Sequence, residues 1–330
     1  MIHPPTQDES HSRPLGNPPR FRFHAKRFNF DGSRAGQLSY GICEVIVPES
    51  HRIGSLGSPL WKRLFNRKDD RLKIENLIAL NRELFFLHYR QSLESMKVRA
   101  VPTLFVHGYN NSFENAVLRA AQIGFDLGLG QGIGLYSWPS KGKKRGYAAD
   151  EATIEASKYH LADFIGEFTS NNPEDGVNII AHSMGCRCLL GAFEVLSGER
   201  PEVLKMINQV ILAAADVDAA AMVHLGKHAI NNCLRTTSYV SDKDKALMVS
   251  EWLHDYPRVG IMPPTFVLDG MDTIIVNNLA LGDFSHGYIG TSRTILNDIF
   301  ALLQSNAPQI SRFSIARHEV ADATCWRLKE

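Results

Sequence analysis

The stretch VNIIAHSMGCRCLLGAFEVL, residues 177–196, carries the strongest indication of how the chain folds. It begins with a short apolar run typical of a buried strand, and it ends with apolar side chains such as Leu189 and Phe193 at helical spacing. Between the two stands Ala-His-Ser-Met-Gly, with a small residue on each side of Ser183 at a distance of two. Small residues there permit a turn so sharp that the serine is held in a strained, exposed position. The segment predicts a strand, a tight turn and a helix, with Ser183 as a candidate nucleophile.

The same alternation of strand and helix continues on both sides of this segment. Such strands, rich in Val, Ile and Leu and joined by helices, form a mostly parallel sheet with helices on both faces. Sheets of this kind bind ligands beyond the carboxyl ends of their strands, so we expect the functional residues directly after each strand. Further strands are expected in residues 39–48, 101–106, 132–138 and 209–215 and ahead of Asp242, and helices in residues 82–96, 112–127 and 150–169.

Composition is that of an ordinary globular protein. The 330 residues include 36 Lys and Arg against 35 Asp and Glu, and 44% of them are hydrophobic. A net charge of +1 creates no basic field, so no nucleic-acid partner is predicted. The longest apolar runs, such as 210–215, are far too short to span a membrane, and the first 20 residues lack the apolar run of a signal peptide. We expect a cytoplasmic chain without an integral membrane segment; no oligomeric state follows from the sequence.

Neither a metal ion nor a cofactor is predicted. The five cysteines are scattered and odd in number, which favours reduced thiols in a cytosolic protein. Cys186 and Cys188 lie two apart on the expected helix and therefore point to different faces. His224 and His228 are one helical turn apart, but no third ligand follows in a recognisable pattern.

Residues 1–36 differ in amino-acid composition from the rest of the chain. They are rich in Pro, Ser, His and Arg and lack apolar periodicity, so we expect a flexible N-terminal arm. No internal repeat and no linker rich in Gly, Pro or Ser interrupts the remainder. Residues 37–330 are therefore predicted to form a single domain.

A second motif, HGYNNSF at residues 107–113, follows the apolar strand that ends at 106. Hydrolysis of an acyl bond develops an oxyanion that needs two hydrogen-bond donors, usually one beside the nucleophile and one from an earlier loop. We expect the amides of Met184 and Tyr109 to be these donors, with the side chain of Asn110 or Asn111 as the alternative for the second.

The two residues that begin this motif have separate expected roles. Gly108 lets the backbone come close to a substrate, and His107 is expected to order the loop through hydrogen bonds. The alternative is a turn that only caps the next helix, through Ser112.

A serine hydroxyl needs an imidazole base that is oriented by a carboxylate. His286, in the loop GDFSHGYI, is the expected base, whereas His182 is built into the turn and is treated as structural. Two aspartates compete for the acid. Asp244 is favoured because it follows the next-to-last strand and gives the chain order Ser, Asp, His, and Asp216 is the alternative. An aspartate after a strand is otherwise often a helix N-cap.

The combination of these motifs resembles the α/β-hydrolase superfamily, and especially bacterial proteins grouped as α/β hydrolases of unknown function. The resemblance runs from about Ser39 to Tyr288. It implies an α/β-hydrolase fold, a triad of Ser183, Asp244 and His286, and an ester-type substrate. The matching segments are YGICEVIVPESHRIGSL, FVHGYNNSFENAV, LYSWPSKG with Tyr147 and Asp150, IIAHSMG, ILAAADVD, SYVSDKDKAL and the loop that contains His286.

Two features bear on the substrate. The sequence between the strand 209–215 and Asp244 is too short for a large lid, so we expect an open site that takes small or extended acyl esters. The loop KGKKR contains Lys141 and Lys143 and forms a local cationic cluster, which would select anionic substrates unless it is only solvated. Together with the three loop residues His107, Gly108 and Asn110, these two lysines are expected to contact the substrate.

Two functions of different class follow. The first is a serine hydrolase that cleaves a carboxylic ester or related acyl bond of a small molecule through an acyl-enzyme. The second is a catalytically silent protein that keeps the fold to bind a partner. The serine, base, acid and oxyanion loop together favour the enzyme, because a scaffold has no need of all four.

Overall fold

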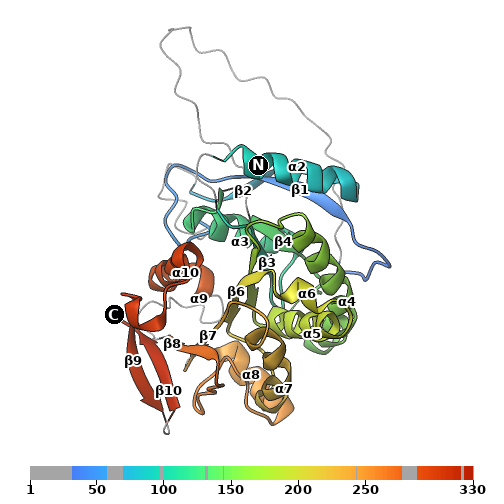
Figure 1. Ribbon diagram of the computed structural model, residues 1–330. Coiled ribbons are helices and arrows are strands. Elements are labelled where there is room, and N and C mark those ends of the chain that lie inside the picture. The colour runs from blue at the N-terminus through green and yellow to red at the C-terminus, as the bar shows by residue number, and fades with distance from the viewer. Residues whose placement is uncertain are drawn as a thin grey trace, which may run out of the picture.

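The computed structural model describes residues 32–57, 70–96, 100–130, 133–143, 145–242, 244–276, 288–320 and 323–329 (Figure 1). The strands are β1 (Tyr40–Ile46), β2 (Lys73–Leu80), β3 (Thr103–Val106), β4 (Ile133–Tyr136), β5 (Val177–His182), β6 (Ile207–Ala213), β7 (Arg235–Ser241), β8 (Met271–Val276), β9 (Ile315–Val320) and β10 (Ala323–Leu328). The helices are α2 (Arg82–Glu94), α3 (Phe113–Asp126), α4 (Tyr147–Ser170), α5 (Met184–Glu199), α6 (Pro201–Leu204), α7 (Ala219–Ile230), α8 (Lys245–His254), α9 (Tyr288–Thr291), α10 (Arg293–Ser305) and the 3₁₀ helix η3 (Gln309–Ser311).

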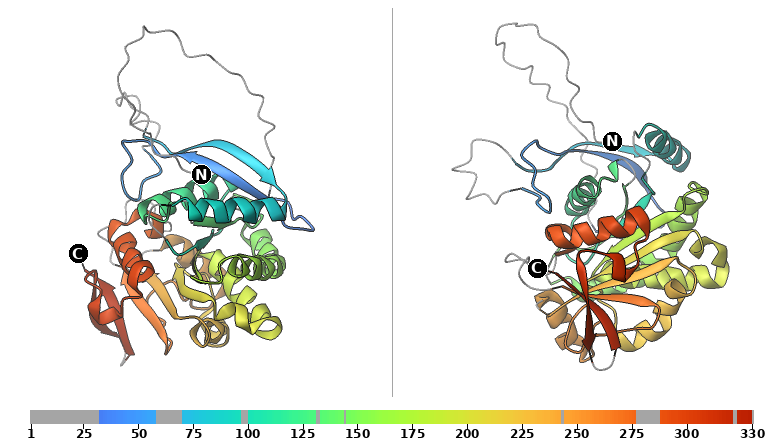
Figure 2. Two further views of the ribbon diagram at one scale, coloured as in Figure 1. Left: turned by 45° about the horizontal axis from the view of Figure 1, so that its top comes forward. Right: turned by 60° about the vertical axis from the view of Figure 1, so that its left-hand side comes forward.

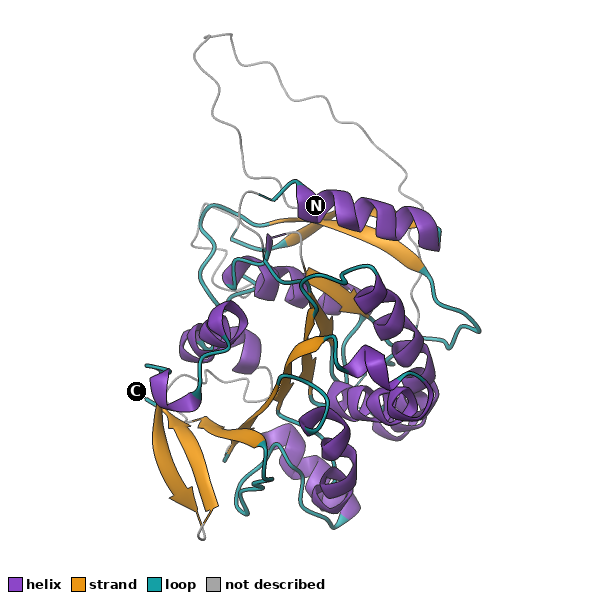
Figure 3. Cartoon of the chain, viewed as in Figure 1, coloured by secondary structure: helices purple, strands orange, loops and turns teal. Residues whose placement is uncertain are grey.

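The central sheet confirms the expected α/β architecture. Within the described part of the chain its strand order is β4-β3-β5-β6-β7-β8-β10-β9 (Figure 3). Every neighbouring pair from β4 to β10 is parallel, and β9 alone pairs antiparallel, with β10. The carboxyl ends of β3, β5, β6 and β7 therefore lie along one edge of the sheet, where the sequence motifs were expected to meet.

Side chains of the central strands alternate between two cores. Leu104 and Val106 of β3 pack with α4, α5 and α7, whereas Phe105 between them packs with α3 and α10 on the other face. Phe105 lies opposite Ile180, which lies opposite Ile211, so one row of buried side chains crosses three strands. Figure 1 shows α4 and α5 on one side of the sheet and α3 and α10 on the other. Burial on both faces explains why β3, β5 and β6 are mostly apolar in sequence.

A separate antiparallel pair, β1 and β2, lies outside the central sheet together with α2 (Figure 2). The strand expected in residues 39–48 exists at Tyr40–Ile46, but it pairs with β2 and not with a strand of the central sheet. The strand β2 was not anticipated from the sequence. Residues 1–31 of the expected N-terminal arm lie outside the described residues.

The segment between β6 and β7 forms α7 and a short connection, with no larger insertion over the sheet. This agrees with the expectation that a large lid is missing there. In the described residues, no helix combines the length and the apolar character that crossing a membrane requires.

Candidate functional site

Ser183 stands at the junction of β5 and α5 with φ 54° and ψ −125°. A residue other than glycine at positive φ costs about 1–3 kcal/mol and persists only where its surroundings enforce it. Here the backbone is held on both sides: the Ser183 amide donates to the Ala213 carbonyl at 2.9 Å, and the Ser183 carbonyl accepts from the amide of Asp216 at 3.2 Å. The end of β6 therefore fixes the strained turn.

Two glycines bring the loop of residues 107–112, the expected oxyanion loop, against this turn. A Cβ at Gly108 would lie 2.7 Å from both the Ser183 Cβ and the His182 ring, and a Cβ at Gly185 would lie 2.4 Å from the His107 carbonyl oxygen. No real Cβ tolerates such distances, so glycine is required at both positions. The loop after β3 and the turn after β5 thus touch, as the motifs predicted.

The expected oxyanion donors lie on these touching segments. Met184 is the first residue of α5, whose first amides have no partner within the helix, and Tyr109 follows Gly108. Asn110 has a φ of 58°, so the loop turns sharply after Tyr109. The side-chain amide of Asn111 donates to the carbonyls of Gly108 and Tyr109 at 3.0 and 3.1 Å. Asn111 therefore stabilises the loop, which leaves Asn110 as the better side-chain alternative.

The loop also caps the next helix. Ser112 is the N-cap of α3, and its hydroxyl accepts from the Asn115 amide at 3.2 Å. Capping and a role in the site are compatible, because the cap uses the end of the loop and leaves the segment at Gly108 free to contact the turn.

The buried side chain of His107 orders the loop that follows β3. Its side chain is only 2% exposed and stacks on Trp138 with ring centroids 5.0 Å apart. Nδ1 lies 2.9 Å from the Gly108 carbonyl, and Nε2 lies 3.1 Å from the Trp138 carbonyl and 3.3 Å from the Ser137 hydroxyl. Burial lowers the pKa of His107 to about 4, so the ring is neutral at pH 7. This geometry supports the ordering role and leaves no ring nitrogen facing a substrate.

Asp216 is buried at the end of β6 and is surrounded by donors. Its carboxylate accepts from the Tyr147 hydroxyl at 2.7 Å and from the Ser250 hydroxyl at 2.6 Å. The Nε of Arg258 lies 3.6 Å away, and both members of that pair are at most 4% exposed. Burial, followed by the nearby Asp216 charge, raises the pKa of Tyr147, which keeps this hydroxyl protonated as a donor. Both Asp216 oxygens are thus occupied.

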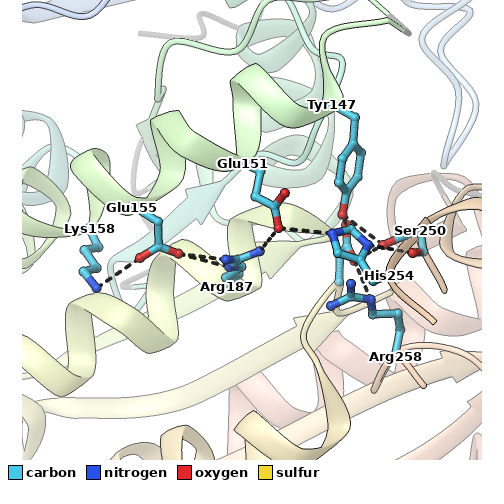
Figure 4. A network of polar contacts seen from close by, with 9 residues as sticks. Tyr147, Glu151, Glu155, Lys158, Arg187, Ser250, His254 and Arg258 are labelled. Carbon is cyan, nitrogen blue, oxygen red and sulfur yellow. Dashed lines mark hydrogen bonds and ion pairs between the residues drawn. The ribbon is translucent and has the colours of Figure 1, made fainter. Parts of the chain in front are cut away.

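The Asp216 group continues into a charged network between α4, α5 and α8 (Figure 4). His254 contacts the Ser250 carbonyl through Nδ1 at 2.7 Å and Glu151 through Nε2 at 3.2 Å. Arg187 then bridges Glu151 at 2.5 Å and Glu155 at 3.0 Å. The network connects α4, α5 and α8 next to Asp216.

Asp244 is fully buried at the start of α8. One of its carboxylate oxygens accepts from the Leu247 amide at 3.1 Å, so Asp244 caps this helix. Asp218 does the same for α7 through the amides of Ala220 and Ala221. Asp244 follows β7, which is the direct neighbour of β8, whereas Asp216 follows β6, one strand further away.

His286, the expected base, lies outside the described residues, in the segment 277–287 that follows β8. The strand before this segment ends at Val276, on the same sheet edge as Ser183.

The cationic loop between β4 and α4 is held by a buried carboxylate. Asp150 accepts from the backbone amide of Lys141 at 2.7 Å and from the Ser140 hydroxyl at 2.7 Å. The ammonium of Lys141 donates to the Gly32 carbonyl at 2.9 Å, and the carbonyl of Lys143 accepts from the Tyr109 hydroxyl at 3.3 Å. The loop is therefore adjacent to the oxyanion loop.

Within the described part of the chain, no three His, Cys, Asp or Glu side chains form a group that could hold a metal ion. The five cysteines carry free thiols. Burial raises the pKa of the Cys186 and Cys188 thiols, so both stay protonated.

Sequence reasoning missed the partners of Asp216. Tyr147 belongs to a segment that carries the family resemblance, whereas no motif marks Ser250 or Arg258. Neither has a signal in the sequence, because each reaches Asp216 from a segment more than 30 residues away.

A family described as alpha/beta hydrolase of unknown function (DUF900) matches residues 88–274, which is more than half of the chain. A crystal structure of a gene product from Listeria innocua is similar over 63% of this chain and 96% of its own length, with 12% identity and a TM-score of 0.38. No curated protein matches the chain. The protein belongs to the family of alpha/beta hydrolases of unknown function.

Proposed function

We propose that the protein is a serine hydrolase that cleaves a carboxylic ester or related acyl bond of a small molecule. The observation that carries the proposal is the backbone of Ser183, which is strained at φ 54° with the loop of Gly108 pressed against it. Strain that neighbouring hydrogen bonds maintain at a serine, beside two segments with amide donors, is the arrangement that acyl transfer needs.

The mechanism assigns one role to each group. His286 accepts the proton of the Ser183 hydroxyl while the Ser183 oxygen attacks the acyl carbon. The amides of Tyr109 and Met184 stabilise the oxyanion of the tetrahedral intermediate. His286 then gives this proton to the leaving group, which departs to leave an acyl-enzyme. In the second half, His286 accepts a proton from water as the water oxygen attacks the acyl carbon, and it returns that proton to the Ser183 oxygen as the acid product is released.

Asp244 is the proposed acid that orients His286. Strand order supports this choice, since β7 and β8 are neighbours and His286 comes after β8. The alternative, Asp216, already accepts hydrogen bonds from Tyr147 and Ser250 on its two oxygens. Asp216 also follows β6, which is one strand further from β8 than β7 is.

Labelling with a fluorophosphonate probe tests the nucleophile. The wild-type protein should react, Ser183→Ala should not, and the control Ser305→Ala on α10 should react like the wild type. Circular dichroism on each variant verifies that the fold is intact. If the folded wild-type protein fails to react between pH 6 and 9, the catalytically silent binding protein becomes the better reading.

The acid is tested by a matched pair, Asp244→Asn and Asp216→Asn. Asparagine still caps α8, so Asp244→Asn should fold while turnover falls about 10⁴-fold, as expected for loss of the triad acid. Asp216→Asn should retain turnover within about tenfold. The reverse result would move the acid to Asp216.

Lys141 and Lys143 are proposed to favour anionic substrates, because their loop lies beside Tyr109. Replacing both with Ser should lower kcat/KM for an anionic ester relative to a neutral ester of the same size. An unchanged ratio would show that the loop is only a solvated surface.

A further inference from the structure

A large cavity separates the β1–β2 pair from the central sheet. Its volume is about 880 Å³, near the upper end of the range for small-molecule sites. One wall is formed by β1, β2 and α2, and the other by β4, α3 and α4. Figure 2 shows the β1–β2 pair and α2 as a layer beside the body of the protein. The cavity exists because, among the described strands, β4 pairs only with β3 and its other edge faces this layer.

Part of the cavity lining is apolar and aromatic. Tyr40, Phe85 and Phe164 line it and contact one another, with ring centroids 5.4 to 6.3 Å apart. Leu135 and Val117 extend this lining along β4 and α3. Apolar surface left exposed to water costs about 25 cal/mol per Å², so a cavity of this composition favours an apolar occupant.

Charge is distributed unevenly along the cavity. Of its described lining residues none is acidic, and the two with a permanent charge are both cations, Arg34 and Lys141. Both side chains are exposed. They lie at the same end of the cavity, because Lys141 donates to the carbonyl of Gly32, two residues before Arg34, while Arg34 itself donates to Thr153. The apolar part of the lining, together with a cationic end, suits a long aliphatic chain that carries a carboxyl group.

This cationic end adjoins the proposed catalytic site. Asn111 lines the cavity there and donates to the Gly108 carbonyl at 3.0 Å. Gly108 in turn lies against Ser183. Asn111 therefore lies between the cavity and the loop that contacts Ser183.

We propose that this cavity binds the acyl chain of the substrate, a long unbranched fatty-acyl group. The inference rests on the proposed hydrolase function for its link to Ser183, but binding of the chain can be measured without catalysis.

The binding test uses palmitate and calorimetric titration on the full chain carrying Ser183→Ala. Palmitate should bind, and adding Ala156→Phe, which fills the cavity from α4, should weaken binding at least tenfold. Ala79→Phe, which fills it from β2, should do the same, so a folding defect in one variant does not remove the test. The control Ala152→Phe is exposed on α4 outside the cavity and should bind palmitate normally.

Turnover gives the second readout in the protein with Ser183 intact. Ala156→Phe should lower the ratio of kcat/KM for p-nitrophenyl palmitate to kcat/KM for p-nitrophenyl acetate at least tenfold. Absence of palmitate binding in the native chain, or binding that neither filling variant weakens, overturns the inference. If the fluorophosphonate probe does not label Ser183 but palmitate binds and both filling variants weaken it, the proposed hydrolysis fails and the cavity remains a fatty-acid site.

Discussion

The strained backbone of Ser183 is sustained by ordinary hydrogen bonds rather than by a special sequence. Its amide and carbonyl are tied to β6 through Ala213 and Asp216, so relaxing φ would break contacts between two central strands. Each bond contributes about 1 kcal/mol, which together offsets the cost of the positive φ. The nucleophile position is therefore a property of the pair β5 and β6.

Burial of the His107 ring predicts how the free energy of unfolding depends on pH. Its folded pKa is about 4, against 6.5 for an exposed histidine, because burial disfavours the charged ring. As the pH falls from 6.5 toward 4, the unfolded chain binds a proton that folded His107 does not, so the free energy of unfolding decreases. The loss attributable to His107 should reach about 3 kcal/mol near pH 4.

Urea denaturation at pH 7 and pH 4.5 measures this effect as a difference between proteins. His107→Asn keeps a donor toward Gly108 but cannot titrate, so its stability should fall less between the two pH values than that of the wild type. The control His224→Asn, exposed on α7, should follow the wild type. Parallel pH profiles for His107→Asn and wild type would contradict the buried neutral ring.

Individual residues were predictable where local chemistry dictates them. Ser183 and Gly108 were identified because a sharp turn and a close backbone approach each demand a residue type at a fixed spacing. Ser250 and Arg258 were not, because any polar residue brought beside Asp216 by the fold could serve as its partner.

At the scale of elements, two glycines of α5 predict opposite effects of the same substitution. Gly185→Ala would place a Cβ 2.4 Å from the His107 carbonyl, so α5 must move away from β3. We expect a loss of about 1–3 kcal/mol in unfolding free energy, as for overpacking in a core. Gly198→Ala meets nothing within 4 Å and should stabilise α5 by about 0.5–1 kcal/mol. Urea denaturation of both variants gives the comparison, and equal effects would contradict the close contact between α5 and β3.

The link between α4 and α8 gives a further prediction. Tyr147→Phe removes the hydroxyl that donates to buried Asp216 and contacts Ser250, so both lose a partner. Unfolding free energy should decrease by about 1–3 kcal/mol. Tyr159→Phe, at a position 55% exposed on the same helix, should change stability by less than about 0.5 kcal/mol. Thermal unfolding followed by circular dichroism would test both, and a stable Tyr147→Phe would show that water replaces the hydroxyl.

Apart from β1, the elements that were predicted correctly are those with burial on both faces or along one helical stripe. The strand β2 was missed for a physical reason: it belongs to a two-stranded sheet, and its partly buried residues, Ile74, Leu77 and Leu80, recur every third position. A register shift opposite Glu44 and Val45 breaks the two-residue period on which strand prediction depends.

For the molecule as a whole, a buried charge network attaches the C-terminal part to the central sheet. Arg312, whose side chain is 0% exposed, contacts Asp298 at 3.1 Å and Asp272 at 3.3 Å. Asp298 also accepts from the Tyr239 hydroxyl at 2.7 Å, and Asp272 pairs with Arg235 at 3.1 Å. These residues come from β7, β8, α10 and the segment before β9, so the network joins elements that only the complete fold brings together.

Arg312→Met should therefore destabilise the whole protein and not only the β9–β10 pair. Without the guanidinium, Asp298 and Asp272 remain buried near each other with fewer compensating charges, which costs about 3–5 kcal/mol when one partner of a buried pair is removed. The control Arg317→Met breaks an ion pair with Glu319 whose side chains are 66% and 68% exposed, and it should change stability by less than about 1 kcal/mol. Urea denaturation followed by tryptophan fluorescence and by circular dichroism should give coincident, shifted transitions for Arg312→Met. A shift confined to one of the two signals would mean that the C-terminal strands unfold separately, and that the network stabilises only that part of the sheet.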